Sequence, residues 1–319
     1  MVAAGCASAR RAAAPAGTAT ATPPATATPA AAASPAATPA ATAKTAATAT
    51  GVGKPTGSQR ELIARAAAAW ESKEEPGSLD EAIRLWEEAA AQPPVPVEAL
   101  TSAARARRLR FERAGLASSD GLHETARDAS ACADDARRAW AAVEPDAAAG
   151  AAAGQPLGDV LAHVGARAAE PLYFEAVCTA AWARAQGFTP LIERRGELKQ
   201  MLTRVAQLAP DLDEAGAERE LGKLYSALPA YAGGDLREAR AHFEAALARA
   251  PSSARTRIVF ARTVGVKAQD RALFEAQLQA ASAAEDRDLA EEAKEMLARE
   301  SELFGPAEAA QPIPGGPTK

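Results

Sequence analysis

Apolar residues recur every three or four positions through most of the chain after residue 57, the period that places them on one face of an α-helix. The spacing is clearest in Leu62, Ala66 and Trp70, and in Leu79, Ile83 and Trp86. Proline or glycine stands where helix chemistry predicts an end, at Pro76-Gly77, Pro93-Pro94, Pro145, Gly187, Pro210, Pro229 and Pro251. The pattern therefore predicts an all-α protein.

Two expected helix starts carry capping residues. Ser78 is followed three residues later by Glu81, the spacing of a capping box, so we expect Ser78 to cap the helix that contains Trp86. Asp235 follows two glycines and is expected to cap a helix that begins at Leu236.

The expected helices repeat a spacing typical of tetratricopeptide units, in which the second helix carries small residues around a bulky one and ends at proline. Two full copies and one degenerate copy are present: Ala82, Trp86, Ala89 and Pro94; Ala239, Phe243, Ala246 and Pro251; and Leu198, Leu202, Val205 and Pro210. The first-helix signature Leu-Gly-x-x-Tyr occurs once, with Gly222 at its glycine. We predict degenerate tetratricopeptide-like helix pairs in an α-solenoid or compact helical ring, closed by a terminal helix over Asp288–Phe304.

Composition supports helices and excludes some partners. Ala, Leu, Glu and Arg dominate after residue 57, whereas the residues that favour strands are scarce there. A net charge of −5 and an aromatic content of 4% leave no basic, aromatic-rich surface for nucleic acid. No run of eighteen apolar residues is present, so no segment of this sequence is expected to span a membrane.

The first 57 residues differ from the rest. They contain four basic residues and no acidic one, and residues 12–57 are nearly all Ala, Thr, Pro, Ser and Gly. Such a segment has too few large apolar groups to offset the entropy lost on ordering. We expect an N-terminal signal remnant over 1–14, a disordered Ala/Pro/Thr tether over 15–57, a helical repeat domain over 58–304 and a disordered tail over 305–319.

Cys6 is a candidate lipidation site. Small residues precede it, as at the end of a bacterial lipoprotein signal, but the basic and apolar parts of such a signal do not fit into the five residues before Cys6. We therefore expect a start upstream of Met1, and a protein held at a membrane only through lipid on Cys6.

Several segments of the helical region resemble the TatT component family of TRAP transporters. The resemblance covers roughly residues 60–300 and is carried by Pro171–Phe174, Ala181–Arg184, Arg219–Tyr225, Leu228–Leu236, Ala239–Pro251 and Gln269–Phe274. It implies a non-catalytic periplasmic lipoprotein with degenerate tetratricopeptide helices. It also implies a homo-oligomer, typically a trimer, that works with the solute-binding protein of a tripartite ATP-independent periplasmic transporter. The Ala/Gly-rich segment 147–158 departs from the family, because its length does not match a helix pair.

Aromatic residues with a polar group suit a partly wet pocket or interface. For Tyr225, which stands at a repeat signature position, and for Trp182, helix packing is the stronger interpretation. Tyr231 lies outside the helical pattern, in a turn longer than the repeat requires, where no core is expected around it. The candidates for ligand or partner binding are therefore Tyr231 first, and then Trp182, Tyr173 and Tyr225.

Motifs that suggest catalysis do not hold. His123-Glu124 begins like a zinc-protease motif, but Arg127 stands where the second histidine belongs. Cys132 and Cys178 have no CxxC partner or adjacent histidine, so we expect buried thiols, with a bridge between them left open. We predict no enzymatic activity, no cofactor, no metal and no catalytic residue.

Two functions remain. The first is an accessory role in solute uptake, in which the protein docks a solute-binding protein and passes a small or hydrophobic ligand. The alternative is a general tetratricopeptide adaptor for envelope protein assembly. Peptide-binding repeats present charged residues at recurrent concave positions, and the three copies here share no such Lys, Arg or Asn set. This absence favours the first function.

Overall fold

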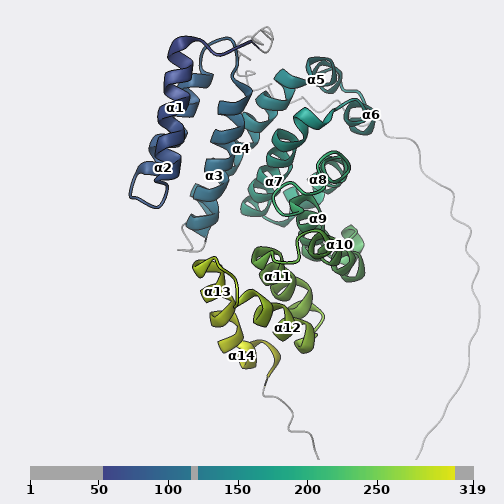
Figure 1. The fold of residues 1–319 in the computed structure, drawn as a ribbon. Helices are drawn as coiled ribbons and strands as arrows, with labels where there is room; N and C mark the ends of the chain where they lie inside the picture. The colour runs from purple at the N-terminus through teal and green to yellow at the C-terminus, as the bar shows by residue number, and fades with distance from the viewer. Residues whose placement is uncertain (1–52, 116–120, 306–319) are drawn as a thin grey trace, which may run out of the picture. The chain divides into compact units, whose positions relative to one another are not determined.

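The regular structure in the described part of this chain is helical. The computed structural model describes residues 53–115 and 121–305, and within these ranges it contains fourteen α-helices and no strand (Figure 1). The prediction of an all-α fold is therefore confirmed. All described residues belong to one compact unit.

The α-helices are α1 (Gly57–Glu71), α2 (Ser78–Ala90), α3 (Val97–Gly115), α4 (Gly121–Val143), α5 (Pro145–Ala152), α6 (Leu157–Ala162), α7 (Ala169–Gln186), α8 (Phe188–Leu208), α9 (Gly216–Ala227), α10 (Leu236–Arg249), α11 (Ala254–Phe260), α12 (Arg271–Ala281), α13 (Arg287–Ala298) and α14 (Glu300–Phe304). Short 3-10 turns, η1 and η2, occupy Ala166–Ala168 and Ala230–Ala232. A π-helical turn, η3, continues α11 over Ala261–Gly265.

The predicted helix ends agree with the structure, and one of the two predicted caps does. Asp235 caps α10, where its Oδ1 accepts a hydrogen bond from the backbone N–H of Arg237 at 2.8 Å. The capping box at Ser78 is wrong, because Gly77 is the N-cap residue and its φ of 81° brings the chain into the helix one residue earlier. A capping box occurs instead at Thr56 and Gln59, at the start of α1.

Two expectations about helix lengths need correction. Segment 147–158 was expected to fit no helix pair, yet Pro145 begins the eight-residue α5, and α6 follows after Gly154 turns the chain with a φ of 77°. The single terminal helix expected over Asp288–Phe304 is two helices, α13 and α14, separated at Arg299.

Helix α7 lies at the centre of the largest apolar cluster. Thirteen of its eighteen residues are buried, and it packs against α3, α4 and α8. A helix buried on nearly all sides cannot be amphipathic, so its polar residues must find partners inside the protein. Two of them, Tyr173 and Glu175, are buried, and Tyr173 takes part in the polar contacts described below.

A disulfide joins α7 to α4. Cys132 and Cys178 are 46 residues apart in sequence, and their Cα atoms are 5.9 Å apart. The expectation of buried thiols is thus wrong, although both residues are buried. The two helices pack along their lengths, and this tertiary contact places the cysteines within bonding range.

The repeat positions of the second helices all point inward. Ala82, Trp86 and Ala89 of α2 are buried, and Trp86 contacts Trp70 of α1 with ring centroids 6.1 Å apart. Ala239, Phe243 and Ala246 of α10 have no exposed surface. Phe243 is stacked on Phe260 of α11 at 5.1 Å, so this ring joins α10 to the next helix.

Gly222 allows α9 to approach α10 closely. A Cβ atom added at this residue would lie 2.9 Å from three atoms of the Phe243 ring, a distance that real contacts essentially never show. Phe243 is fully enclosed, so the ring has no room to withdraw.

Replacing Gly222 with alanine should therefore lower the free energy of unfolding by about 1–3 kcal/mol, as overpacking does elsewhere. Gly196→Ala is the matched control, because Gly196 lies on the exposed side of α8 with no atom within 4 Å of an added Cβ. That change should stabilise the protein by up to about 1 kcal/mol. Urea unfolding of both variants measures the contrast, and an equal response from both would contradict the close contact.

Candidate functional site

The four aromatic candidates occupy different environments. Tyr173 on α7 is completely buried, Trp182 on the same helix and Tyr225 on α9 are partly buried, and Tyr231 on η2 is 85% exposed. Tyr173 thus contacts no solvent and lines no open surface. The four side chains do not form one shared lining. Cys6, the candidate lipidation site, lies outside the described residues.

Tyr231 lies in a hydrogen-bonded turn between α9 and α10, residues 228–235, which we call the Tyr231 turn. The backbone N–H groups of Ala232 and Gly234 both donate to the carbonyl oxygen of Pro229, at 2.9 and 3.0 Å. At Gly234 an added Cβ would lie 1.8 Å from the carbonyl oxygen of Leu228, so only glycine fits. The turn therefore presents Tyr231 from a rigid backbone. Within the described ranges, Phe188 at 48% is the other exposed large hydrophobic residue.

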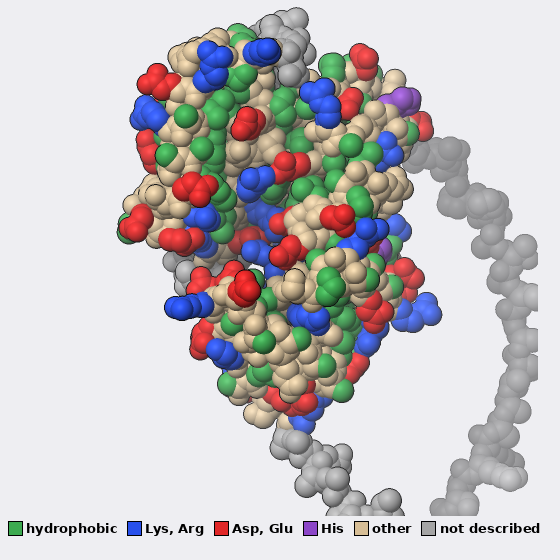
Figure 2. Space-filling model, in the orientation of Figure 1, with side chains coloured by type: hydrophobic (Ala, Val, Ile, Leu, Met, Phe, Trp, Pro, Cys, Tyr) green, Lys and Arg blue, Asp and Glu red, His purple; other side chains and the backbone are tan. Residues whose placement is uncertain are grey.

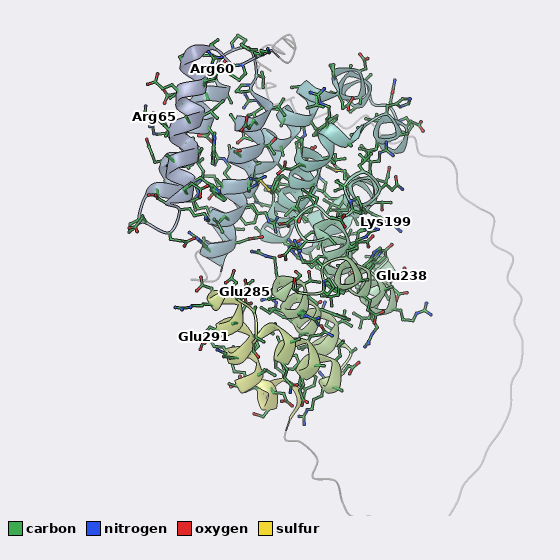
Figure 3. All side chains as sticks on the ribbon, in the orientation of Figure 1. Arg60, Arg65, Lys199, Glu238, Glu285 and Glu291 are labelled. Carbon is green, nitrogen blue, oxygen red and sulfur yellow. A yellow bond between two sulfur atoms is a disulfide. The ribbon has the colours of Figure 1, made fainter. Side chains whose placement is uncertain are left out.

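Two side chains, those of His242 and Lys199, pack against the ring of Tyr225. His242 is stacked on it with ring centroids 5.3 Å apart, and the Nζ of Lys199 lies 5.1 Å from the ring centroid (Figure 3 labels Lys199). His242 Nδ1 is in turn 2.6 Å from a carboxylate oxygen of Glu218. Trp182 packs against the main core, with the guanidinium of Arg194 5.9 Å from its ring centroid. These contacts give both residues a structural role.

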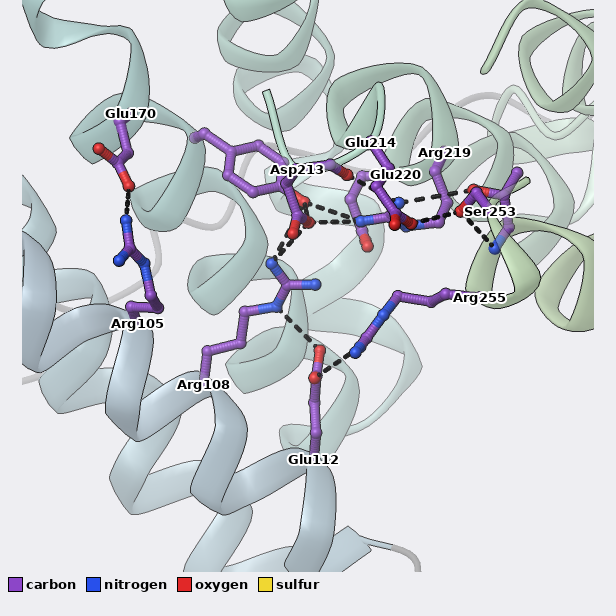
Figure 4. Close-up of polar contacts among 12 residues, drawn as sticks. Arg105, Arg108, Glu112, Glu170, Asp213, Glu214, Arg219, Glu220, Ser253 and Arg255 are labelled. Atoms are coloured by element: carbon purple, nitrogen blue, oxygen red, sulfur yellow. Dashed lines mark hydrogen bonds and ion pairs between the residues drawn. The ribbon is translucent and has the colours of Figure 1, made fainter. Parts of the chain in front are cut away.

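The most concentrated chemistry in the structure surrounds the carboxylate of Asp213, in the turn between α8 and α9 (Figure 4). Its Oδ2 atom accepts hydrogen bonds from Arg108 Nη1 at 2.8 Å, from Arg219 Nη2 at 2.5 Å and from Tyr173 Oη at 2.6 Å. We call Arg108, Tyr173, Asp213 and Arg219 the Asp213 cluster. It joins α3, α7 and α9 at one carboxylate oxygen.

The backbone that carries Asp213 is strained. Asp213, Glu214 and Ala215 have φ values of 51°, 56° and 57°, so three consecutive residues other than glycine are left-handed. This conformation costs on the order of 1–2 kcal/mol per residue. Glu214 accepts a hydrogen bond from Ser253 Oγ at 2.6 Å, which helps to hold the turn. Strain of this kind persists only where the surroundings enforce it, and it concentrates at functional sites.

Burial and opposite charge set the ionisation of the cluster. Burial acts to raise the pKa of Asp213, but the charges of Arg108 and Arg219 outweigh it and hold that pKa well below its usual value. Burial also raises the pKa of the Tyr173 hydroxyl, so it remains a neutral donor. The carboxylate is therefore ionised at every physiological pH and neutralises part of the charge of two buried guanidinium groups.

A second buried ion pair lies one residue further along α9. Lys223 Nζ is 2.7 Å from a carboxylate oxygen of Glu220, and Glu220 is buried. Burial lowers the pKa of Lys223 to about 8, despite the nearby charge of Glu220. For Glu220 burial acts to raise the pKa, but Lys223 and Arg219 lower it to about 2.

Further charged side chains lie next to the cluster. Glu112, one turn after Arg108 on α3, accepts hydrogen bonds from Arg108 at 2.9 Å and from Arg255 of α11 at 3.0 Å. Figure 2 shows the surface hollowed where α3 and α11 approach each other, with basic and acidic side chains gathered there. Arg105 and Glu170 form a further ion pair between α3 and α7. Arg105, Arg108 and Glu112 thus share one face of α3.

Sequence reasoning did not find this cluster. Glu/Arg pairs along a helix usually mark solvated faces, and Asp213 lies 105 residues from Arg108. One available signal was the spacing of Arg105, Arg108 and Glu112, which places three charges on the same side of α3.

The low pKa of Glu220 predicts acid sensitivity. Its usual pKa is 4.5, so between pH 4.5 and about 2 the unfolded chain binds a proton at this residue and the folded chain does not. The resulting stability is present above pH 4.5 and is lost as the pH falls through this range. Glu220→Gln removes the titrating group, so the free energy of unfolding should fall less steeply with decreasing pH than in the unsubstituted protein.

Urea unfolding at a series of acidic pH values measures this slope. Glu291→Gln is the control, because Glu291 lies exposed on α13 (Figure 3), 3.5 Å from Lys294 Nζ. It should retain the original slope. A Glu220→Gln variant with an unchanged slope would show that Glu220 does not contribute to acid sensitivity.

Two features are absent from the described part of the chain. None of its helices is long and apolar enough to cross a membrane. Within the same ranges no three His, Cys, Asp or Glu residues are placed together to hold a metal ion.

Comparison with known proteins identifies the family. No curated protein matches the sequence. The sequence model of the TRAP transporter T-component family, TAtT, matches residues 103–304, which run from within α3 to the end of α14 and include the Asp213 cluster and the Tyr231 turn. Because the match covers more than half of the chain, the protein belongs to the TRAP transporter T-component family.

Proposed function

We propose that this protein is a non-catalytic accessory component of TRAP-type solute uptake that docks a periplasmic solute-binding protein. The family match supports an accessory role in TRAP transport, and docking is the more specific step that we add. By resemblance to the family, we further propose a homo-oligomer, with three copies as the expected number. We also propose that lipid on Cys6 anchors it in the periplasm.

The observation that carries the docking proposal is the Tyr231 turn. A tyrosine that is 85% exposed on a rigid backbone loses little conformational entropy on binding and offers a large apolar surface with a hydroxyl. Aromatic residues of this kind dominate the binding energy of many interfaces. The bonded turn and the requirement for glycine at Gly234 keep its position fixed.

The other aromatic candidates have lesser roles in this proposal. Trp182 and Tyr225 keep part of their surface exposed and serve as secondary contacts for a ligand or partner. Tyr173 is enclosed, so it acts on any ligand only through Asp213 and the two arginines that it contacts.

The disulfide supports a location outside the cytoplasm. Disulfides form and persist in oxidising compartments such as the bacterial periplasm and are rare in the cytosol. The bond between Cys132 and Cys178 is buried between α4 and α7, where it stabilises the helix pair that holds Tyr173.

Tyr231→Ala should weaken binding to the solute-binding protein of the cognate TRAP transporter by about tenfold or more, as for an aromatic hot spot. Its melting temperature should not change, because the side chain has little buried surface. Biolayer interferometry of the full chain measures the affinity. Phe188→Ala, which removes the other exposed aromatic ring, is the control and should bind normally. Unchanged binding by Tyr231→Ala would exclude this turn from the docking surface.

The disulfide should form only after export. Protein recovered from the periplasm should carry no free thiol at Cys132 or Cys178 under denaturing, non-reducing alkylation, whereas protein retained in the cytoplasm should be alkylated at both. Replacing both residues with serine should lower the free energy of unfolding of the oxidised protein by about 2–4 kcal/mol. Free thiols in the exported protein would contradict the bond.

A further inference from the structure

We propose that the Asp213 cluster is a carboxylate-binding site in which Asp213 acts as an internal ligand, and that the carboxylate of a small organic acid replaces it. This proposal goes beyond docking and does not depend on it, because it concerns binding to the isolated protein. Three observations carry it: the donors around Asp213, the strained backbone beneath it and its access to solvent.

The donors form a recognition site for a carboxylate. Two guanidinium groups and a phenol converge on a single oxygen, within 2.5–2.8 Å. Arginine is well suited to carboxylate recognition because its planar donors are fixed in direction and always charged. Arg108 lies on α3, Tyr173 on α7 and Arg219 on α9, so all three donors are held by helices. The donor side of the site is therefore organised by the fold.

The acceptor side is held differently. Asp213 belongs to a connecting turn, and its own residue and the next two are left-handed without being glycine. Arg219 Nη1 also donates to the carbonyl oxygen of Asp213 at 3.0 Å, and Ser253 holds Glu214, so the bonds of the carboxylate are one of several contacts that keep this backbone left-handed. Withdrawal of the carboxylate would remove part of what enforces the strain, and an external carboxylate can supply the same bonds without that part.

Solvent reaches the side chain of Asp213. The Asp213 side chain is 35% exposed, whereas that of Arg219, which it contacts, is 1% exposed. In the nearby ion pair between α3 and α11, the side chain of Arg255 is 40% exposed and that of Glu112 is 31% exposed. Partly exposed pairs of this kind hold less firmly than buried ones, so a small anion can pass this pair.

Charge selects the ligand class. If Asp213 withdraws and no anion replaces it, Arg108 and Arg219 lose a shared counter-ion in a buried setting, which is strongly unfavourable. A neutral or purely hydrophobic ligand cannot meet this requirement. A carboxylate can, and the hydroxyl of Tyr173 donates to it as it now donates to Asp213.

Acetate is the probe for this site, and Asp213→Gly is the informative variant. Glycine accepts the φ of 51° and leaves the two arginines without the internal carboxylate. The full-length variant should melt below the unsubstituted protein in chloride, and sodium acetate at the same ionic strength should raise its melting temperature. By calorimetry it should bind acetate at least about tenfold more tightly than the unsubstituted protein, where Asp213 competes.

Two controls locate the effect. Asp211 lies in the same turn, and its side chain is 82% exposed and 3.4 Å from Arg249. The melting temperature of the Asp211→Gly variant should not respond specifically to acetate. Adding Arg108→Lys to Asp213→Gly should abolish the response, because the fixed guanidinium donor is lost.

The proposal is overturned if the unsubstituted protein shows no saturable acetate binding by calorimetry. It is also overturned if acetate raises the melting temperature of Asp213→Gly no more than chloride does, or no more than it raises that of Asp211→Gly. Should Asp213→Gly fail to fold, Asp213→Asn, which keeps the shape of the side chain, replaces it in the same measurements. Failure of both variants to fold even in acetate would show that Asp213 is an irreplaceable structural counter-ion, and would equally overturn the proposal.

Discussion

Two guanidinium groups enclosed among helices need a counter-charge, and much of this structure follows from how that need is met. A buried charge without a partner costs several kcal/mol. Arg108 and Arg219 come from α3 and α9, and Asp213 reaches both from the turn before α9. The turn takes a left-handed path to do so, and at Gly216 an added Cβ would lie 2.4 Å from Tyr173 Oη. The start of α9 is thereby fixed against α7.

The high alanine content of this core makes its charged contacts more important, because alanine side chains bury little apolar area. Many of the buried apolar residues in the described part of the chain are alanines, which let helices approach closely but bury little apolar area each. The ring of Phe243 against Gly222 and the disulfide between α4 and α7 are local exceptions. Between α3, α9 and α11, ion pairs such as Glu112 with Arg255 supply contacts that large apolar side chains supply in other proteins. Such contacts are directional, and they fix the relative positions of these helices more sharply than apolar packing would.

What could be predicted from the sequence was local chemistry. Proline and glycine marked the helix ends, and Asp235 capped α10, because these effects depend on residues a few positions apart. Ser78 failed as a cap since the alternative conformation of Gly77 was equally compatible with the sequence. The disulfide and the Asp213 cluster could not be predicted, because each depends on which helices pack together. Cys132 and Cys178 are 46 residues apart, and Arg108 and Asp213 are 105 apart.

Helix α9 connects the Asp213 cluster to the Tyr231 turn, the two features on which the functional proposals rest. Its first turn follows Asp213, and after its last turn the backbone N–H of Asp235 donates to the carbonyl oxygen of Tyr225 at 3.1 Å, which fixes the end of the Tyr231 turn to the helix. A displacement of α9 would therefore move both. The contact between Gly222 and Phe243 opposes such a displacement, because the ring is enclosed and the two helices touch without a gap. If an external carboxylate replaces Asp213 as proposed, this contact favours an exchange that is accommodated within the turn before α9, with α9 and the turn that carries Tyr231 left in place.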